Sequence, residues 1–180
     1  VSAFFSRAVD STEIFSKLKI AESTGYKKHL NTHDVIRIDF SRMPRNCNSY
    51  DKYIERIERI LIQDLMEAYP KADIQEEDAV WDSLDLVYER YGCQRFIFVF
   101  DEWDCIFHKD FITDEDKKKY ISFLSSLLKD KAYVLLSYMT GILPIAKYSS
   151  GSELNMFAEY TMVSEEKFSD AFGFTEAEVD

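Results

Sequence analysis

The sequence predicts an α/β domain in which helices pack on both faces of a parallel sheet, giving three layers. Stretches with the length and apolar content of buried strands alternate along the chain with amphipathic helical stretches, which is the pattern of parallel α/β folds. The most apolar strand ends abruptly in acidic residues, as a central strand does where it leaves the core. With 180 residues, of which 46% are hydrophobic, the chain is long enough for one domain with a substantial core.

The first forty residues predict short helical segments followed by a strand. Residues 2–9 have the character of the end of a helix, and Asp10 or Ser11 is placed to cap a second, short one. The segment 35–40 is rich in β-branched residues and carries a carboxylate, Asp39, near its end. This composition indicates a strand.

Two amphipathic helices are predicted between this strand and the next. The first starts at Ser49, after a loop over residues 41–48, and stops at Pro70, because proline cannot continue a helix. The second covers about residues 77–90. Apolar residues recur at helical spacing in both and should cover the sheet: Tyr50, Tyr53, Ile54, Ile57, Ile60, Leu61 and Leu65 in the first, and Val80, Trp81, Leu84, Val87 and Tyr88 in the second.

The uninterrupted apolar run from Phe96 to Phe100 is followed directly by Asp101 and Glu102. This is the Walker B pattern of phosphate-loop NTPases. In that chemistry the first acid helps to hold a magnesium ion, because a hard cation takes oxygen ligands, and the second acts as general base toward the attacking water. The same residues are also compatible with a buried strand that merely ends in solvated carboxylates.

A further helix and strand follow. Thr113, with acids at positions 114–116, predicts a capped helix N-terminus, and residues 132–139 predict another buried strand. Thr140 then places a hydroxyl at the sheet edge that carries Asp101. Beyond it, the sequence predicts a Ser/Gly-rich loop, a short last strand at 160–163 and a helix that starts at 164 and turns at 172–175.

Composition excludes several classes of protein. The net charge of −11 argues against a nucleic-acid-binding surface, and no apolar run reaches the ~18 residues of a membrane span. Three cysteines without Cys-x-x-Cys spacing indicate neither a disulfide framework nor a zinc site, which fits a cytoplasmic location. His29 and His33 have i, i+4 spacing but no acidic motif, so a solvated helix end is favoured over a metal site.

Both ends of the sequence predict a fragment of a longer protein. Val1 lies inside an apolar stretch, and Thr175 with Glu178 has the capping-box spacing of a helix start close to the other end. We therefore expect residues 1–180 to be the downstream part of one domain, with 164–180 beginning the helical segment that follows.

Four segments carry a more specific resemblance. They are Phe15-Ser-Lys-Leu-Lys-Ile20, Phe98-Val-Phe-Asp-Glu-Trp-Asp104, Tyr138-Met-Thr-Gly-Ile-Leu-Pro-Ile-Ala-Lys147, and Phe168 with Phe172-Gly-Phe-Thr175. In this order they resemble the predicted AAA-ATPase-like family of bacterial proteins, and the resemblance covers essentially the whole chain. It implies a three-layer, P-loop NTPase-like domain, which in the family is typically followed by a PD-(D/E)XK nuclease-like domain.

The resemblance also implies roles for five residues. Asp101 corresponds to the acid that holds Mg²⁺, Glu102 to the catalytic glutamate, and Thr140 to the sensor residue that contacts the γ-phosphate of ATP. Asp104 and Lys147 match further family positions counted with the cofactor-binding residues, and the sequence leaves open whether they contact nucleotide or anchor loops. The implied cofactor and ligand are Mg²⁺ and ATP, with no membrane and no direct nucleic-acid partner.

One departure from the family is informative. No Gly-x-x-x-x-Gly-Lys-Ser/Thr motif occurs in the 180 residues, and their five glycines cannot form one. In the family this phosphate loop would lie just upstream of Val1, so the first strand of a sheet with order 5-1-4-3-2 would be missing. The strands at 35–40, 96–100 and 133–138 would then be direct neighbours. The last of them would have an exposed edge, to be filled by an upstream segment, by another copy of the chain or by local rearrangement.

Three functions are compatible with these observations. The first is an ATP-binding and ATP-hydrolysing module, and the second is an inactive nucleotide-sensing or protein-interaction module that regulates an attached nuclease-like domain. The third, a metal-dependent nuclease built on the carboxylates, is disfavoured because Asp101-Glu-Trp-Asp supplies no acid-x-lysine pair. Arg37, Arg42 and Arg45 are candidates for an arginine finger by charge alone, and the sequence does not assign one.

Overall fold

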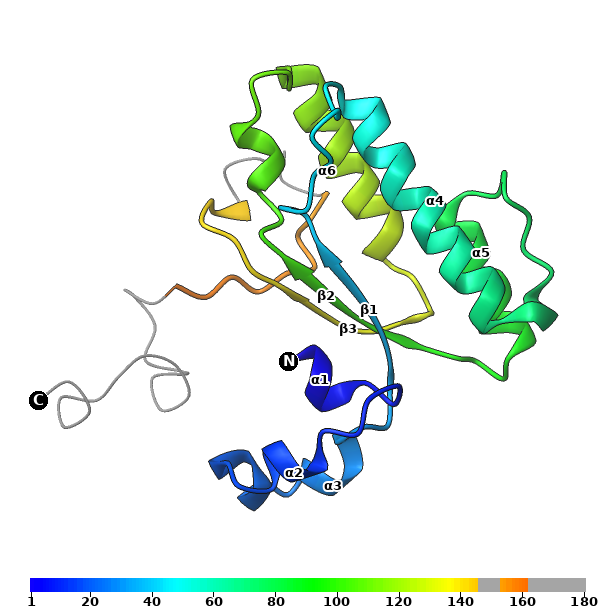
Figure 1. Cartoon of the computed structure of the whole chain (residues 1–180), viewed down its shortest axis with the longest axis vertical. Coiled ribbons are helices and arrows are strands. Elements are labelled where there is room, and N and C mark those ends of the chain that lie inside the picture. Colours follow the sequence, from blue (N-terminus) through cyan, green and yellow to red (C-terminus); the bar gives the residue numbers. More distant parts are fainter. Residues whose placement is uncertain (146–152, 162–180) are drawn as a thin grey trace, which may run out of the picture.

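The centre of the protein is a three-stranded parallel sheet, seen in a computed structural model that describes residues 1–145 and 153–161 (Figure 1). The strands are β1 (Asp34–Asp39), β2 (Phe96–Asp101) and β3 (Val134–Met139), in the order β1-β2-β3. Both pairings are parallel, so all three strands end at the same edge. The prediction that these strands are direct neighbours is confirmed.

Helices connect the strands and precede the sheet. The long ones are α4 (Tyr50–Ala68), α5 (Val80–Arg90) and α6 (Asp114–Leu128); the short ones are α1 (Ser2–Phe5), α2 (Thr12–Phe15) and α3 (Tyr26–His29), with 3₁₀ turns at Lys19–Glu22, Pro70–Ala72 and Cys105–His108. Helix α5 begins three residues later than predicted. The residues before it form a turn instead, in which the backbone N–H of Gln75 donates to the carboxylate of Asp78.

The two predicted helix starts at Ser49 and Thr113 are confirmed by their side-chain bonds. The Ser49 hydroxyl accepts from the backbone N–H of Lys52, which satisfies one of the free donors of α4. At α6, Thr113 and Asp116 form a reciprocal capping box. Both bonds involve residues three apart, and this is why local sequence predicted them.

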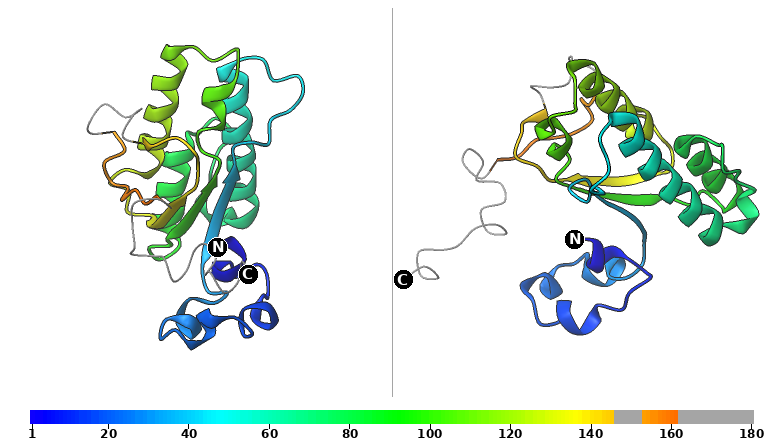
Figure 2. Two further views of the ribbon diagram at one scale, coloured as in Figure 1. Left: turned by 90° about the vertical axis from the view of Figure 1, so that its left-hand side faces the viewer. Right: turned by 45° about the horizontal axis from the view of Figure 1, so that its top comes forward.

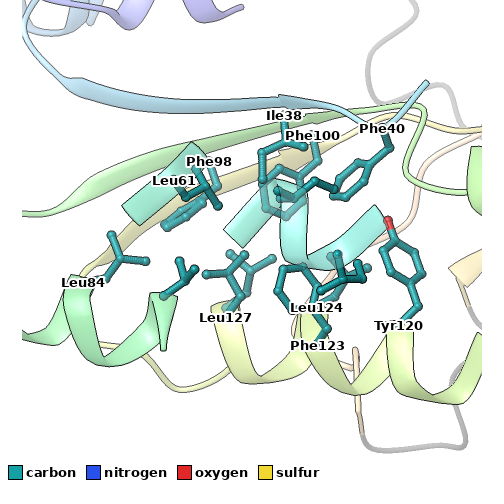
Figure 3. Packing of buried hydrophobic residues seen from close by; sticks show 14 of the residues in the cluster. Ile38, Phe40, Leu61, Leu84, Phe98, Phe100, Tyr120, Phe123, Leu124 and Leu127 are labelled. Carbon is teal, nitrogen blue, oxygen red and sulfur yellow. The ribbon is translucent and has the colours of Figure 1, made fainter. Parts of the chain in front are cut away.

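The core lies between the sheet and the long helices (Figure 3). Phe98 and Phe100 of β2 point into it from the strand, and Leu84, Leu124 and Leu127 meet them from α5 and α6. All five side chains are at most 1% exposed. Because burial of one such side chain contributes about 1.5–3 kcal/mol, the sheet is a rigid platform for the loops at its carboxyl edge.

Helices α4, α5 and α6 all cover the same face of the sheet (Figures 1 and 2). The α/β class and the parallel sheet are confirmed, and the complete three-layer arrangement stays a prediction. The strand order explains the position of these helices. Each crossover moves one strand further in the same direction, so connections of the usual right-handed kind place their helices on one face. Within the described residues, neither crossover reverses direction along the sheet, so α4, α5 and α6 stay on one side of it.

The N-terminal segment forms a small unit of its own around α1, α2 and α3, near the start of β1 (Figure 2). The predicted helix over residues 2–9 is shorter, because α1 ends at Phe5 and Ser6 bridges to His33. Asn31 holds the unit together from a left-handed conformation, with φ +53°; its side-chain amide donates to the carbonyls of Ala3, Ser6 and Val9.

Strand β3 is one of the two edge strands of the described sheet. Leu135 and Leu136 are both 44% exposed, and the register of β3 against β2 is irregular at this point. The predicted last strand, 160–163, is absent at Tyr160 and Thr161, and its remaining residues lie outside the described part of the chain together with the predicted 149–152 loop and segment 164–180. Of the helices in the described ranges, none combines the length and the apolar content needed to cross a membrane.

Candidate functional site

The carboxyl edge of the sheet brings Asp101 and Thr140 into contact. Asp101 is the last residue of β2, and Thr140 directly follows β3. The Thr140 hydroxyl donates to Asp101 Oδ1 over 2.6 Å, and the Thr140 backbone N–H donates to the carbonyl of Phe100 over 2.9 Å. The short bond to a carboxylate is of the charge-assisted kind and orients the Asp101 side chain.

Arg37 lies on the other side of Asp101. Its Nη2 atom is 3.5 Å from Asp101 Oδ2, and both side chains are almost half exposed. An ion pair with this exposure contributes at most about 1 kcal/mol, so the second oxygen of Asp101 is only loosely held. Charge alone singled out Arg37 in the sequence; its pairing with Asp101 depends on the register of β1 against β2.

Asp39 supplies a second carboxylate at the same edge, because it is the register partner of Asp101. The Ser41 hydroxyl donates to Asp39 over 2.6 Å, and Arg42 Nε donates over 3.0 Å. The hydrogen bond from the Ser41 side chain is the main cause that holds the pKa of Asp39 below its ordinary value, with further contributions from the Ser41 backbone and Arg42. Arg42 is thus engaged within its own loop.

Glu102 turns the chain away from the sheet in an uncommon conformation. Its φ is +49°, in the left-handed region that non-glycine residues seldom adopt, and its side chain is exposed. Trp103 follows and is buried, and its backbone N–H donates to the carbonyl of Thr140 over 3.1 Å. Such backbone strain persists where surrounding contacts impose it and concentrates at functional sites.

Asp104 is buried and contacts the loop after β3. Its Oδ2 atom accepts hydrogen bonds from the backbone N–H groups of Ile142 (3.0 Å) and Leu143 (2.7 Å). The sequence left open whether Asp104 contacts nucleotide or anchors a loop, and these two hydrogen bonds are of the loop-anchoring kind. Lys147, the other such residue, lies outside the described part of the chain.

Two tyrosines of the covering helices donate hydrogen bonds to the backbone at this edge, and of these Tyr53 was predicted only as a member of an apolar stripe. Tyr53 of α4 donates its hydroxyl to the carbonyl of Phe40 over 2.6 Å, and Tyr120 of α6 donates to that of Trp103 over 2.7 Å. The only available signal was a tyrosine at a core position, because a buried phenol requires a partner.

The oxygen atoms that meet at this edge are of the kind that a hard cation takes as ligands. Within residues 1–145 and 153–161, no three or more His, Cys, Asp or Glu side chains converge as a metal-binding group. Asp101 and Thr140 instead offer one carboxylate and one hydroxyl. Mg²⁺ is commonly bound by one or two carboxylates and takes its other ligands from water and substrate phosphates.

Comparison with known proteins identifies the family of the chain. No curated protein and no solved structure matches the chain. The family model described as "Predicted AAA-ATPase" matches residues 1–150, which include the three strands, Asp101 and Thr140. The chain therefore belongs to the predicted AAA-ATPase family.

Proposed function

We propose that this chain is the downstream part of a module that binds and hydrolyses ATP at the carboxyl edge of the sheet. In this proposal Asp101 holds Mg²⁺, Glu102 activates the attacking water and Thr140 contacts the γ-phosphate. The observation that carries it is the 2.6 Å bond between Thr140 Oγ1 and Asp101 Oδ1 in a chain of this family. A hydroxyl at the end of one strand thereby touches a carboxylate at the end of the next.

The proposed division of labour follows from the contacts of each residue. Thr140 fixes one oxygen of Asp101, and the weak Arg37 contact leaves the other available to a cation. Bound Mg²⁺ would neutralise charge on the phosphates. Glu102 has an exposed carboxylate and can reach a water at this edge as general base.

The phosphate loop completes the proposal. Residues 1–180 contain no Gly-x-x-x-x-Gly-Lys-Ser/Thr motif, so we place the loop and its strand before Val1. That strand would pair with the edge of β3 that carries no strand among the described residues. The backbone cradle and the lysine that hold the β- and γ-phosphates would come from that segment.

Calorimetry with Mg²⁺-ATP tests the proposal on this chain and on a version extended upstream of Val1. We expect binding in the extended version, weakened at least about tenfold by Asp101→Asn because the hard cation loses a charged oxygen ligand. Glu102→Gln should keep binding and reduce turnover by about 10²–10⁴-fold. Glu89→Gln, at an exposed position in α5, is the matched control and should change neither. If no version binds nucleotide, the proposal fails.

The competing proposal is an inactive nucleotide-sensing or protein-interaction module that regulates an attached nuclease-like domain. The contact that favours it is the Arg37–Asp101 ion pair, because an arginine there can replace the charge of a cation. Binding of nucleotide without any turnover for Glu102→Gln to abolish would identify this second function.

A further inference from the structure

A buried carboxylate joins the two loops that leave β2 and β3. Asp104 is 3% exposed, although it lies only three residues beyond Asp101. Its Oδ2 atom accepts from two successive backbone N–H groups, those of Ile142 and Leu143. Among the described residues, no lysine, arginine or histidine forms a salt bridge with it, so these backbone donors are its identified partners. Removing them would leave a desolvated acceptor, which is costly.

Gly141 allows this close approach. A β-carbon at this position would lie 2.6 Å from Asp104 Oδ1 and closer still to the ring of Trp103. Such separations are below any normal contact between non-bonded atoms, so a larger residue would push the loop away from Asp104. The loop after β3 therefore packs directly on the Trp103–Asp104 segment.

Hydrogen bonds hold the chain on both sides of the Thr140 side chain. At Thr140 itself, the backbone carbonyl accepts from the N–H of Trp103, and the backbone N–H donates to the carbonyl of Phe100. Beyond Gly141, the next two backbone N–H groups, those of Ile142 and Leu143, donate to Asp104. The position of the Thr140 hydroxyl, 2.6 Å from Asp101, is thus set from both sides.

We propose that Asp104 is a positioning residue that acts through the backbone of residues 141–143 to hold the Thr140 hydroxyl against Asp101. It does so as a hydrogen-bond acceptor and does not bind the metal ion or the nucleotide. This inference rests on the proposed function for its consequence in ATP binding, but its structural part can be tested without nucleotide.

A ligand role and an anchoring role for Asp104 require different properties of the side chain. A metal ligand requires negative charge and access to the ion, whereas an anchor requires only an acceptor oxygen at the position of Oδ2. Asparagine keeps such an oxygen and removes the charge; alanine removes both. Asp104→Asn and Asp104→Ala therefore separate the two roles, with Asp101→Asn as the reference for a lost ligand.

The first measurement is made by NMR on this chain without nucleotide. In Asp104→Ala we expect hydrogen exchange at the Ile142 and Leu143 amides to accelerate at least about tenfold, and in Asp104→Asn by less than about threefold. The methyl resonance of Thr140 should shift in Asp104→Ala and stay near its wild-type position in Asp104→Asn. Unchanged exchange and an unchanged Thr140 signal in Asp104→Ala would overturn the proposal.

The second measurement is Mg²⁺-ATP affinity in the version extended upstream of Val1. Asp104→Asn should bind within about threefold of wild type, and Asp104→Ala should bind at least about tenfold more weakly. In a Thr140→Val background, Asp104→Ala should have little further effect, because the two residues act on the same contact. A loss in Asp104→Asn as large as in Asp101→Asn would show instead that Asp104 is a ligand.

These measurements keep the two proposals separate. Failure of the wild type to bind nucleotide refutes the proposed ATPase function, while the NMR measurement still decides whether Asp104 anchors Thr140. If Asp104→Ala does not fold, Asp104→Asn alone decides between the two roles, because an anchor predicts near-normal behaviour and a ligand predicts the defect of Asp101→Asn.

Discussion

Removing one hydroxyl group at Tyr120 tests how the edge of the sheet is held. The Tyr120 hydroxyl donates to the carbonyl of Trp103 over 2.7 Å, and the side chain is fully buried. Burial raises the pKa of Tyr120 well above its ordinary value, so the group stays a donor throughout the pH range of any assay. Tyr120→Phe keeps the ring and leaves the Trp103 carbonyl without this partner.

The expected cost follows from that carbonyl. A buried group left without its hydrogen bond costs about 1–3 kcal/mol, so we expect a loss of about 2 kcal/mol in the free energy of unfolding. With a urea m-value of about 2 kcal/mol/M, the unfolding midpoint should fall by about 1 M at unchanged m. Urea titration followed by far-UV circular dichroism measures this shift.

Tyr133→Phe is the matched control. Its hydroxyl is equally buried and donates to the carbonyl of Leu127 over 2.7 Å, away from Trp103. A similar loss of stability is expected, but only Tyr120→Phe should alter the near-UV signal of Trp103. A midpoint in Tyr120→Phe within about 0.2 M of wild type would refute the reasoning, because the bond would then contribute less than about 0.5 kcal/mol.

Two further predictions concern the N-terminal unit and the edge of β3. Burial, followed by the charges of His29 and Arg7, lowers the pKa of His33 against the opposing effect of Asp34. The unfolded state then binds more protons below pH 6.5, so stability should fall as the pH drops from 7.5 to 5.5. Urea titrations at both pH values should show His33→Asn flattening this slope; an equal slope in both proteins contradicts the assignment. The exposed Leu136 predicts self-association through β3. Sedimentation should show wild-type dimers that Leu136→Glu abolishes, and a wild type that stays monomeric at all concentrations would exclude this contact.

Sequence predicted those features that depend on near neighbours. The helix starts at Ser49 and Thr113 involve bonds between residues three apart, and the apolar run from Phe96 to Phe100 requires burial on both faces wherever the strand lies. The meeting of Asp101 and Thr140 was also accessible, because parallel strands end at one edge.

The remaining features depend on contacts between distant parts of the chain. Helices on one face of the sheet follow from strand order, which alternating elements do not specify. The Arg37 ion pair depends on strand register, and the bond from Tyr120 to Trp103 depends on how α6 packs. The need for glycine at 141 becomes visible only when the Trp103 ring is placed beside it.

The lengths of chain between paired strands also affect the order in which the sheet can form. Phe96 of β2 pairs with Val134 of β3 and with Asp34 of β1, and the stretch of chain closed by the first pairing is much the shorter. Closing the shorter loop costs less conformational entropy, and α6 is the only long helix that must form within it, together with the 3₁₀ turn at Cys105–His108. The unit β2-α6-β3 can therefore assemble early, with β1 joining once α4 and α5 are in place. The Asp101–Thr140 contact belongs to this unit, so this part of the candidate site can form before β1 joins the sheet.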